Sequence, residues 1–535
     1  KDVDWKIYLE DKRGYGTDEV PPLDPKQFFA SSYNAKRLQN FVSNAAQVMT
    51  VLLEEEAHGF KNTLSLQQSD SNMGFSDGYI PIYCDDIDFL KDRRVTHVSF
   101  SPHFSNIVVT CYDKSVQPEE YLPIEITNRW LICLWDMIAI SQPLKILVAS
   151  APVESIVFDS LYSDLLYAGL SDGIICLWDM SEPEMDHDRC RRTNFDTILR
   201  TPTYCSYSSG VDTKEIHTNP VICLRSTSSG RRLADDGMST PTTLYSLSDD
   251  GKLLIWTVVR IPDNSVHLKK IDIRVSPWGR VRLALISVHH PRETAPREVR
   301  SNIDFFCMEV KQTNSSLLLG TNMGFVLQYP LSKFKTVTPR FGEINSSLLI
   351  TDIELCPHDS RCFLVGVSDG SLRLHSEMTS RPLKVFTVSN LLASGISSVR
   401  WSNFKPGLII TLDRDSNLLV WNLCESDLQP VVKMSFKATD ERNEVLKRAL
   451  TTSQIPPDRL EKLVKFMLPA TGMQAGPRIS RMDLSRDIRL PYLGIVVSGA
   501  TVHVHRFSNE FAAKGADIKN RELNVLRKYL DLLHK

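Results

Sequence analysis

The chain has 535 residues, of which 42% are hydrophobic and 24% charged, and its formal net charge is −2. This composition is typical of a globular protein, and the small charge excludes a general electrostatic attraction to nucleic acid or to an anionic membrane. No run approaches about 18 uncharged apolar residues, so the sequence predicts no membrane insertion. The 11 cysteines are scattered without zinc-ligand spacing, which favours a reducing compartment.

The N-terminal part of the chain divides into an arm and a linker that contains a helix. Residues 1–33 are polar and rich in proline, which predicts an extended arm. Residues 34–90 begin with apolar side chains at three- and four-residue intervals, the pattern of an amphipathic helix, and continue as loop from 57 to 90. We expect this helix to pack on the rest of the molecule or on a partner. The side chains expected to make that contact are Leu38, Phe41, Val48 and Leu52.

A repeated phrase marks residues 91–510: a tight polar turn, an alternating apolar strand, then Trp. Its clearest copy is Gly169-Leu-Ser-Asp-Gly-Ile-Ile-Cys-Leu-Trp-Asp179. A period of about 40–45 residues with a Trp-Asp ending is typical of a WD-repeat blade. The sequence therefore predicts an all-β fold, a seven-bladed WD-repeat β-propeller with flanking amphipathic helices. The expected structural residues are the turn glycines and the terminal Trp and Asp, namely Gly173, Gly251, Gly370, Trp135, Asp136, Trp178, Asp179, Trp256, Trp401 and Trp421.

Seven sets of strands can be counted along this region, and the seventh is the weakest repeat. The spacing between them predicts insertions near 114–129, 181–218, 260–300 and 437–478. The insertion at 260–300 contains Trp278 and a basic stretch, and strands of its own are expected there. We expect the first three insertions to set binding specificity around the rim of the propeller.

Residues 511–535 predict a second amphipathic helix. Its apolar stripe consists of Leu523, Leu526, Leu530 and Leu533. Two alternatives remain for this stripe: docking beneath the propeller, or insertion into a groove of another chain.

Candidate catalytic and metal-binding residues do not form a convincing set, and no cofactor is predicted. His97 lies among strand residues and is expected to be a core or turn histidine. His503 and His505 share one face of a strand, but two ligands without a third make a poor metal site. The sequence therefore predicts a non-catalytic binding scaffold, with no catalytic, cofactor-binding or metal residues.

Two stretches resemble the dynein intermediate-chain family. Val399-Arg-Trp-Ser-Asn-Phe-Lys-Pro406, with the strand that ends at Trp421, is similar to that family's Val-Arg-Trp-Ser-x-x-x-Pro stretch. Gly366-Val-Ser-Asp-Gly-Ser-Leu-Arg-Leu-His375 resembles its Ser-x-x-Asp-Gly-x-Val-x-Leu blade, although it ends in His. The flanking helices fit as well, and the first is most similar to the dynein-2 branch. The resemblance covers most of residues 34–535.

This resemblance implies a non-catalytic subunit of a microtubule motor. In the family, the propeller binds a helical-bundle segment of the heavy-chain tail, and a disordered N-terminal region holds light chains. The implied partners are a dynein heavy chain, a second dynein intermediate chain, light chains bound upstream of residue 1 or within residues 1–33, and the intraflagellar transport train. The dynein-2 branch drives retrograde intraflagellar transport, which implies the cytoplasm, cytoskeleton, cilium and basal body as locations.

Two alternatives belong to other functional classes. A WD-repeat scaffold or substrate receptor of a non-motor assembly would show a basic pocket for an acidic or phosphorylated motif. A propeller enzyme would need carboxylates or histidines converging on the central channel, a set that the sequence does not reveal.

Overall fold

The structure is a computed structural model that describes the chain in segments. The described residues are 41–46, 49, 74–83, 87, 89–115, 124–190, 197–207, 216–228, 242–261, 274–311, 316–331, 338–387, 394–435, 479–486, 491–497, 499, 501–512 and 516–534. They belong to two units, residues 1–64 and 65–535. In the first unit, residues 41–46 and 49 are helical. The second unit contains the propeller.

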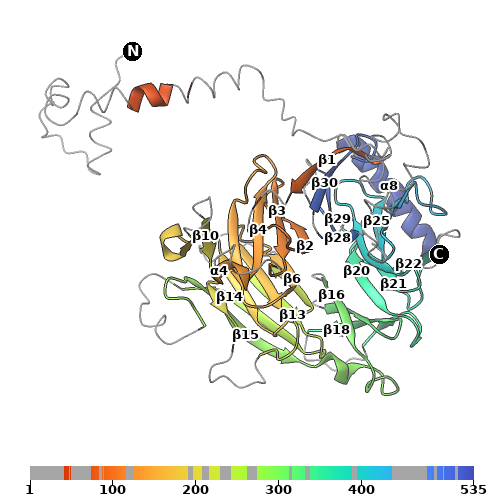
Figure 1. Ribbon diagram of the computed structural model, residues 1–535. Coiled ribbons are helices and arrows are strands. Elements are labelled where there is room, and N and C mark those ends of the chain that lie inside the picture. Colours follow the sequence, from red (N-terminus) through yellow and green to blue (C-terminus); the bar gives the residue numbers. More distant parts are fainter. Residues whose placement is uncertain are drawn as a thin grey trace, which may run out of the picture. The chain divides into compact units, whose positions relative to one another are not determined.

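The described strands of the second unit form seven sheets arranged as the blades of a propeller (Figure 1). In each blade, the first three strands pair antiparallel with their neighbours in the sequence. The first strands lie innermost, because each contacts the first strands of the two adjacent blades and the seventh blade returns to the first. The seven-bladed propeller predicted from the repeats is confirmed.

Blade one has six described strands, whereas blades two and three have four each. Blade one has β2 (Val95–Phe100), β3 (Ile107–Tyr112), β4 (Trp130–Asp136) and β5 (Lys145–Ala149), followed by β10 (Thr197–Arg200) and β9 (Asp188–Cys190). Blade two has β6 (Val153–Phe158), β7 (Leu165–Leu170), β8 (Ile175–Asp179) and β11 (Tyr204–Cys205). Blade three has β12 (Cys223–Ser228), β13 (Thr242–Leu247), β14 (Leu253–Arg260) and β15 (Val281–His289).

Blades four to seven each have four strands. Blade four has β16 (Phe305–Lys311), β17 (Ser316–Thr321), β18 (Val326–Pro330) and β19 (Arg340–Phe341), and blade five has β20 (Ile350–Leu355), β21 (Cys362–Val367), β22 (Leu372–Ser376) and β23 (Lys384–Phe386). Blade six has β24 (Ile396–Trp401), β25 (Leu408–Asp413), β26 (Asn417–Asn422) and β27 (Val432–Ser435), and blade seven has β28 (Ile479–Leu484), β29 (Tyr492–Val497), β30 (Thr501–Phe507) and β1 (Ser76–Tyr83). The helical elements among the described residues of this unit are α4 (Ile124–Thr127), η1 (Glu184–Asp186), η3 (Pro291–Thr294) and α8 (Ala516–Leu533).

The seventh blade is completed by a strand that precedes all the others in the sequence. β1 pairs antiparallel with β30, so that Ile80 lies opposite Val504. The prediction that residues 57–90 are loop is therefore wrong for Ser76–Tyr83, and the propeller begins before residue 91. This strand is hard to predict from the sequence because Gly78 and Pro81 are residue types that are disfavoured in strands. Proline is tolerated at the edge of a sheet, where β1 lies, because its missing N–H is not needed there.

Two of the predicted insertions supply blade strands. The segment 181–218 contains β9, β10 and β11, and the segment 260–300 contains β15, the fourth strand of blade three. In the segment 114–129, α4 offers the Ile126 carbonyl to the Arg93 guanidinium at 2.6 Å, while residues 116–123 lie outside the described residues. The segment 437–478 also lies outside them.

Tryptophans of the third strands are buried between neighbouring blades. Trp178 packs in one apolar cluster with residues of β3, β4 and β5 from blade one. Trp256 shares a cluster with Leu165 and Tyr167 of blade two. Trp135 is fully buried, and its indole N–H donates to the Thr110 hydroxyl at 2.7 Å. The rings of Trp178 and Trp256 thus fill the space between two sheets and contribute to the apolar burial between blades.

Helix α8 packs on the propeller through its apolar stripe (Figure 1). Leu526 and Leu530 are buried in one cluster with Trp401 and Trp421, and Leu533 is packed against it. Polar contacts fix the helix as well: Lys519 donates to the Asn403 carbonyl at 3.0 Å, and the Tyr529 hydroxyl donates to Asp427 at 3.0 Å. Of the two alternatives for this helix, the structure shows the docked arrangement.

Replacing Leu530 by Ala is expected to lower the free energy of unfolding by about 2–5 kcal/mol, because it opens a cavity in the cluster beneath blades five and six. Leu532→Ala is the matched control, since Leu532 exposes 67% of its surface. Urea unfolding of both variants measures the difference. Equal stability of the two variants would mean that α8 does not stabilise the propeller.

Candidate functional site

The propeller has two faces that differ in chemistry. All first strands begin at one face, to which the tight turns between second and third strands also return. The opposite face carries the ends of the first strands, the loops that follow the third strands, and α8, which contacts Trp401 at the end of β24. We call these the pocket face and the α8 face.

Charged side chains of the first strands form ion pairs between adjacent blades around the central channel. The Arg400 guanidinium in β24 lies 2.8 Å from Asp352 in β20 and 3.2 Å from Asp483 in β28. Arg225 in β12 pairs with Glu309 in β16 at 2.8 Å. Burial by itself lowers the pKa of Arg400, but the neighbouring carboxylates outweigh burial and raise it above its ordinary value. The deep channel therefore holds arginines whose charge is matched by carboxylates.

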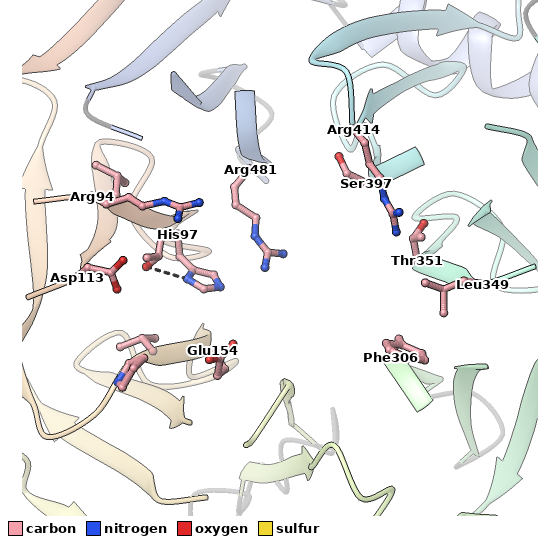
Figure 2. A pocket seen from close by; sticks show the side chains of 14 residues that line it. Arg94, His97, Asp113, Glu154, Phe306, Leu349, Thr351, Ser397, Arg414 and Arg481 are labelled. Atoms are coloured by element: carbon pink, nitrogen blue, oxygen red, sulfur yellow. Dashed lines mark hydrogen bonds between the residues drawn. The ribbon is translucent and has the colours of Figure 1, made fainter. Parts of the chain in front are cut away.

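A cavity of about 550 Å³ opens where the channel meets the pocket face (Figure 2). Its wall combines three kinds of side chain, which follow one another around the ring. They are a basic arc of Arg414, Arg481 and Arg94 from blades six, seven and one, an acidic arc of Asp113 and Glu154 from blades one and two, and an apolar arc of Phe306 and Leu349 from blades four and five. We refer to this cavity as the mouth pocket.

The three arginines of the basic arc differ from those deeper in the channel. Among the described residues, no carboxylate lies within 4.0 Å of the guanidinium nitrogens of Arg94, Arg414 or Arg481. Burial lowers the pKa of Arg481, and the more distant charges of Asp352 and Glu154 offset only part of that effect. The mouth pocket therefore presents cationic groups that have hydrogen-bond donors to spare.

His97 lies on the wall of the mouth pocket, between the basic and acidic arcs. Burial, followed by the charge of Arg481, lowers the pKa of His97 to about 3, so its ring is neutral near pH 7. Its Nδ1 lies 3.2 Å from the Thr96 hydroxyl. Burial raises the pKa of Asp113, against the opposing influence of Arg94. In the part of the chain that the structure describes, no three His, Cys, Asp or Glu side chains are grouped to hold a metal ion.

The α8 face carries exposed apolar side chains. Ile138 and Leu144 lie in the loop after β4, and their side chains are 63% and 56% exposed. The corresponding loops of blades two, five and six expose Met185, Met378 and Leu428. Ile138 and Leu144 bring two exposed apolar groups onto one loop, and a contiguous apolar area is typical of a protein-binding surface.

His503 and His505 lie on β30, facing β1. The ring of His503 stacks on Tyr79 with centroids 4.5 Å apart, and His505 Nδ1 lies 3.3 Å from the Ser76 hydroxyl. Both histidines thus contact the strand that completes the ring, and burial lowers the pKa of His503 to about 4.

Lowering the pH from about 7.5 to about 5 is expected to destabilise the propeller partly through His505. Burial, and then the charge of His503, lowers the pKa of His505 from 6.5 to about 3. The unfolded chain therefore binds more protons between these values, and stability that is present above pH 6.5 is lost as the pH falls. His505 is expected to contribute about 2 kcal/mol to this loss, measured by urea unfolding.

His505→Gln should reduce this loss, whereas His290→Gln, at an exposed position, should leave it unchanged. A pH dependence in His505→Gln equal to that of the unmodified chain would contradict the assignment.

The predicted structural residues occupy turns and strand ends. Gly173, Gly251 and Gly370 have φ values of 86°, 79° and 82°, a region that favours glycine. At Gly173, a Cβ would also lie 2.7 Å from the His217 carbonyl oxygen. Asp136 accepts the backbone N–H of Ile138 at 3.0 Å, in the loop after β4.

The remaining predicted residues are placed as follows. Asp179 accepts the backbone N–H of Ser181 at 2.8 Å, and Trp401 donates to the Pro406 carbonyl at 2.8 Å. Leu523 is half-buried on α8. Phe41 is 67% exposed on its helix. Leu38, Val48 and Leu52 lie outside the described residues.

Sequence reasoning missed the residues of the mouth pocket. Arg94 and Arg481 lie near opposite ends of the propeller sequence, and only closure of the ring brings them to the same opening. Their positions in the repeats could have indicated this pocket. Each of Glu154, Thr351 and Ser397 is the second residue of the first strand of its blade. His97 was expected in the core or a turn, but it lies on the pocket wall.

The sequence was compared with those of known proteins, and it matches the following relatives. Cytoplasmic dynein 2 intermediate chain 1 of Mus musculus is 26% identical over 456 residues, which cover 81% of this chain and 45% of that protein. The Homo sapiens protein of the same name is 26% identical over 419 residues, covering 74% of this chain and 38% of that protein. Cytoplasmic dynein 2 intermediate chain 2 of Mus musculus is 23% identical over 333 residues, covering 58% and 54%.

This chain is similar to the dynein-2 intermediate chains. The predicted resemblance and its dynein-2 branch are thereby confirmed. The chain spans less than half the length of the intermediate chains 1 that it matches. No family model matches the sequence. Among the described residues, no helix has the length and apolar character needed to cross a bilayer.

Proposed function

We propose that this chain is a non-catalytic intermediate chain of a dynein motor, and that its propeller binds the heavy-chain tail. The observation that carries the proposal is the similarity to dynein-2 intermediate chain 1 over 81% of this chain. A match of that extent has to include most of the propeller. The charge-paired channel and the rigid ring of seven sheets are consistent with a scaffold.

The dynein-2 branch supports a role in retrograde intraflagellar transport. The proposed partners are a heavy chain, a second intermediate chain, the transport train, and light chains bound within residues 1–33 or upstream. The proposed locations are the cytoplasm, cytoskeleton, cilium and basal body.

The α8 face is the surface that we assign to the heavy-chain tail. Its exposed Ile138, Leu144 and Met185 side chains lie on loops held by buried strands. A surface fixed in this way loses little conformational entropy on binding, so more of its contact energy appears as affinity. An apolar stripe of a helical tail segment would bury these side chains.

A tagged pull-down of this chain from ciliated cells, with partners identified by mass spectrometry, tests the proposal. We expect a dynein heavy chain, a second intermediate chain and light chains. The double variant Ile138→Asp/Leu144→Asp should recover about tenfold less heavy chain, because it places charges in an apolar contact. Ile286→Asp is the control, since Ile286 is exposed on β15 of blade three, away from these loops.

Recovery of a cullin adaptor or another scaffold without dynein would overturn the motor assignment and favour the alternative, a scaffold or substrate receptor of a non-motor assembly. Recovery of heavy chain that is equal for both variants would instead move its binding surface away from the α8 face.

A further inference from the structure

The mouth pocket gathers more positive charge on one side than the carboxylates of the described residues neutralise. Figure 2 shows Arg481 and Arg414 reaching into the opening, with Arg94 on the neighbouring blade. These three arginines come from the consecutive blades six, seven and one, so they form one continuous arc. By contrast, Arg400 and Arg225 of the same channel each form an ion pair with a carboxylate at 2.8 Å.

The carboxylates of the mouth pocket do not form ion pairs with these three arginines. Asp113 and Glu154 belong to blades one and two, and Arg414 lies across the opening from them (Figure 2). Neither carboxylate is within ion-pair distance of the three guanidinium groups, and His97 is neutral. All three arginines are exposed at the opening, so their guanidinium groups are accessible to an anion that brings several acceptor oxygens.

The opposite wall of the pocket is apolar. Phe306 exposes 42% of its surface from β16, and Leu349 lies beside it, just before β20. A cavity of about 550 Å³ has the size of a site for a short peptide segment rather than for an ion alone. An occupant that matches both walls carries an anionic group next to an apolar side chain.

We propose that the mouth pocket binds a phosphorylated serine or threonine in a segment of a partner protein. Arg414 and Arg481 hold the phosphoryl oxygens, Arg94 adds charge at the rim, and Phe306 contacts an apolar residue beside the phosphorylated one. A phosphoryl group suits this arc better than a carboxylate, because it carries close to two negative charges and three acceptor oxygens that separate arginines can share. This assignment concerns the opposite face of the propeller from the proposed heavy-chain surface. A basic pocket is also the feature expected of a non-motor scaffold or substrate receptor, and the pull-down distinguishes the two functions.

Three degenerate peptide libraries, identical except for a central phosphoserine, serine or glutamate, provide the test. The purified whole chain is immobilised, and the bound peptides are quantified. We expect the phosphoserine library to be enriched about tenfold or more over the other two, with selection for apolar residues next to the fixed position. The enrichment should weaken as salt is raised.

The double variant Arg414→Gln/Arg481→Gln is expected to lose this enrichment by roughly tenfold or more, while Arg381→Gln, at an exposed loop position, keeps it. Arg414→Gln alone, in the exposed turn after β25, serves if the double variant does not fold. Equal capture of the phosphoserine and glutamate libraries, or undiminished capture by the folded variant, would overturn the proposal. Either result leaves the heavy-chain assignment untouched, because the pull-down tests it separately.

Discussion

A chain that starts at Asp85 is expected to lose cooperative unfolding and to aggregate, whereas one that starts at Ser65 should unfold like the whole chain. The shorter chain lacks β1, and with it the buried side chains of Phe75, Ile80 and Ile82. Burial of such side chains stabilises by about 1.5–3 kcal/mol each, so the loss approaches the whole stability of a typical domain.

The same truncation also leaves β30 as an unpaired edge, which can pair with another molecule. Thermal unfolding and size-exclusion chromatography of the two truncated chains measure both effects. The chain that starts at Ser65 is the control, because it removes the whole first unit but keeps β1. Indistinguishable midpoints for the two chains would show that the ring does not depend on β1.

Replacing Arg400 by Met is expected to lower the free energy of unfolding by about 3 kcal/mol. Arg400 joins blade six to blade five through Asp352 and to blade seven through Asp483. Met keeps much of the side-chain volume but leaves three carboxylates in the channel, those of Asp352, Asp483 and Glu354, without their counter-ion. The cost of an uncompensated charge, rather than a lost contact, accounts for most of the expected effect.

Arg381→Met is the matched control for this substitution. Its side chain is 83% exposed and lies 3.9 Å from Glu343, so its loss should change stability by about 0.5 kcal/mol or less. Combining Arg400→Met with Asp352→Asn should recover part of the stability, because one of the uncompensated charges is then removed. A loss equal to that of Arg381→Met would mean that water in the channel screens the charges of this ion-pair network.

The fold was predictable because its local signals repeat. Gly173 provides the positive φ that the Asp-Gly turn requires, and Trp178 fills the space between two sheets. The chain uses the same turn and the same aromatic position in several blades. Blade five was found from its turn at Gly370, although His375 replaces the usual Trp and stacks on Phe363. The propeller could therefore be derived from turn chemistry and apolar alternation alone.

The parts that escaped prediction depend on closure of the ring. β1 has no repeat around it, and Pro81 argues against a central strand, so only its pairing with β30 reveals it. The mouth pocket has the same origin. Arg94, Arg414 and Arg481 carry no shared motif, and each one alone looks like a solvated surface residue until six blades bring their first strands to one opening. Docking of α8 was left open, because an amphipathic stripe does not identify the surface that covers it.

The position of β1 also affects how the protein is made. The Ser76 and His505 side chains, which meet in the seventh blade, are 429 residues apart in the sequence. At ribosomal rates of about 5–20 residues per second, β1 waits roughly 20–90 s for its partner strand to be synthesised. Until then, the ring is open, and its unpaired strand edges are exposed to neighbouring chains. Protease digestion of ribosome-bound chains should therefore show late, abrupt protection of β1, at the moment when β30 emerges.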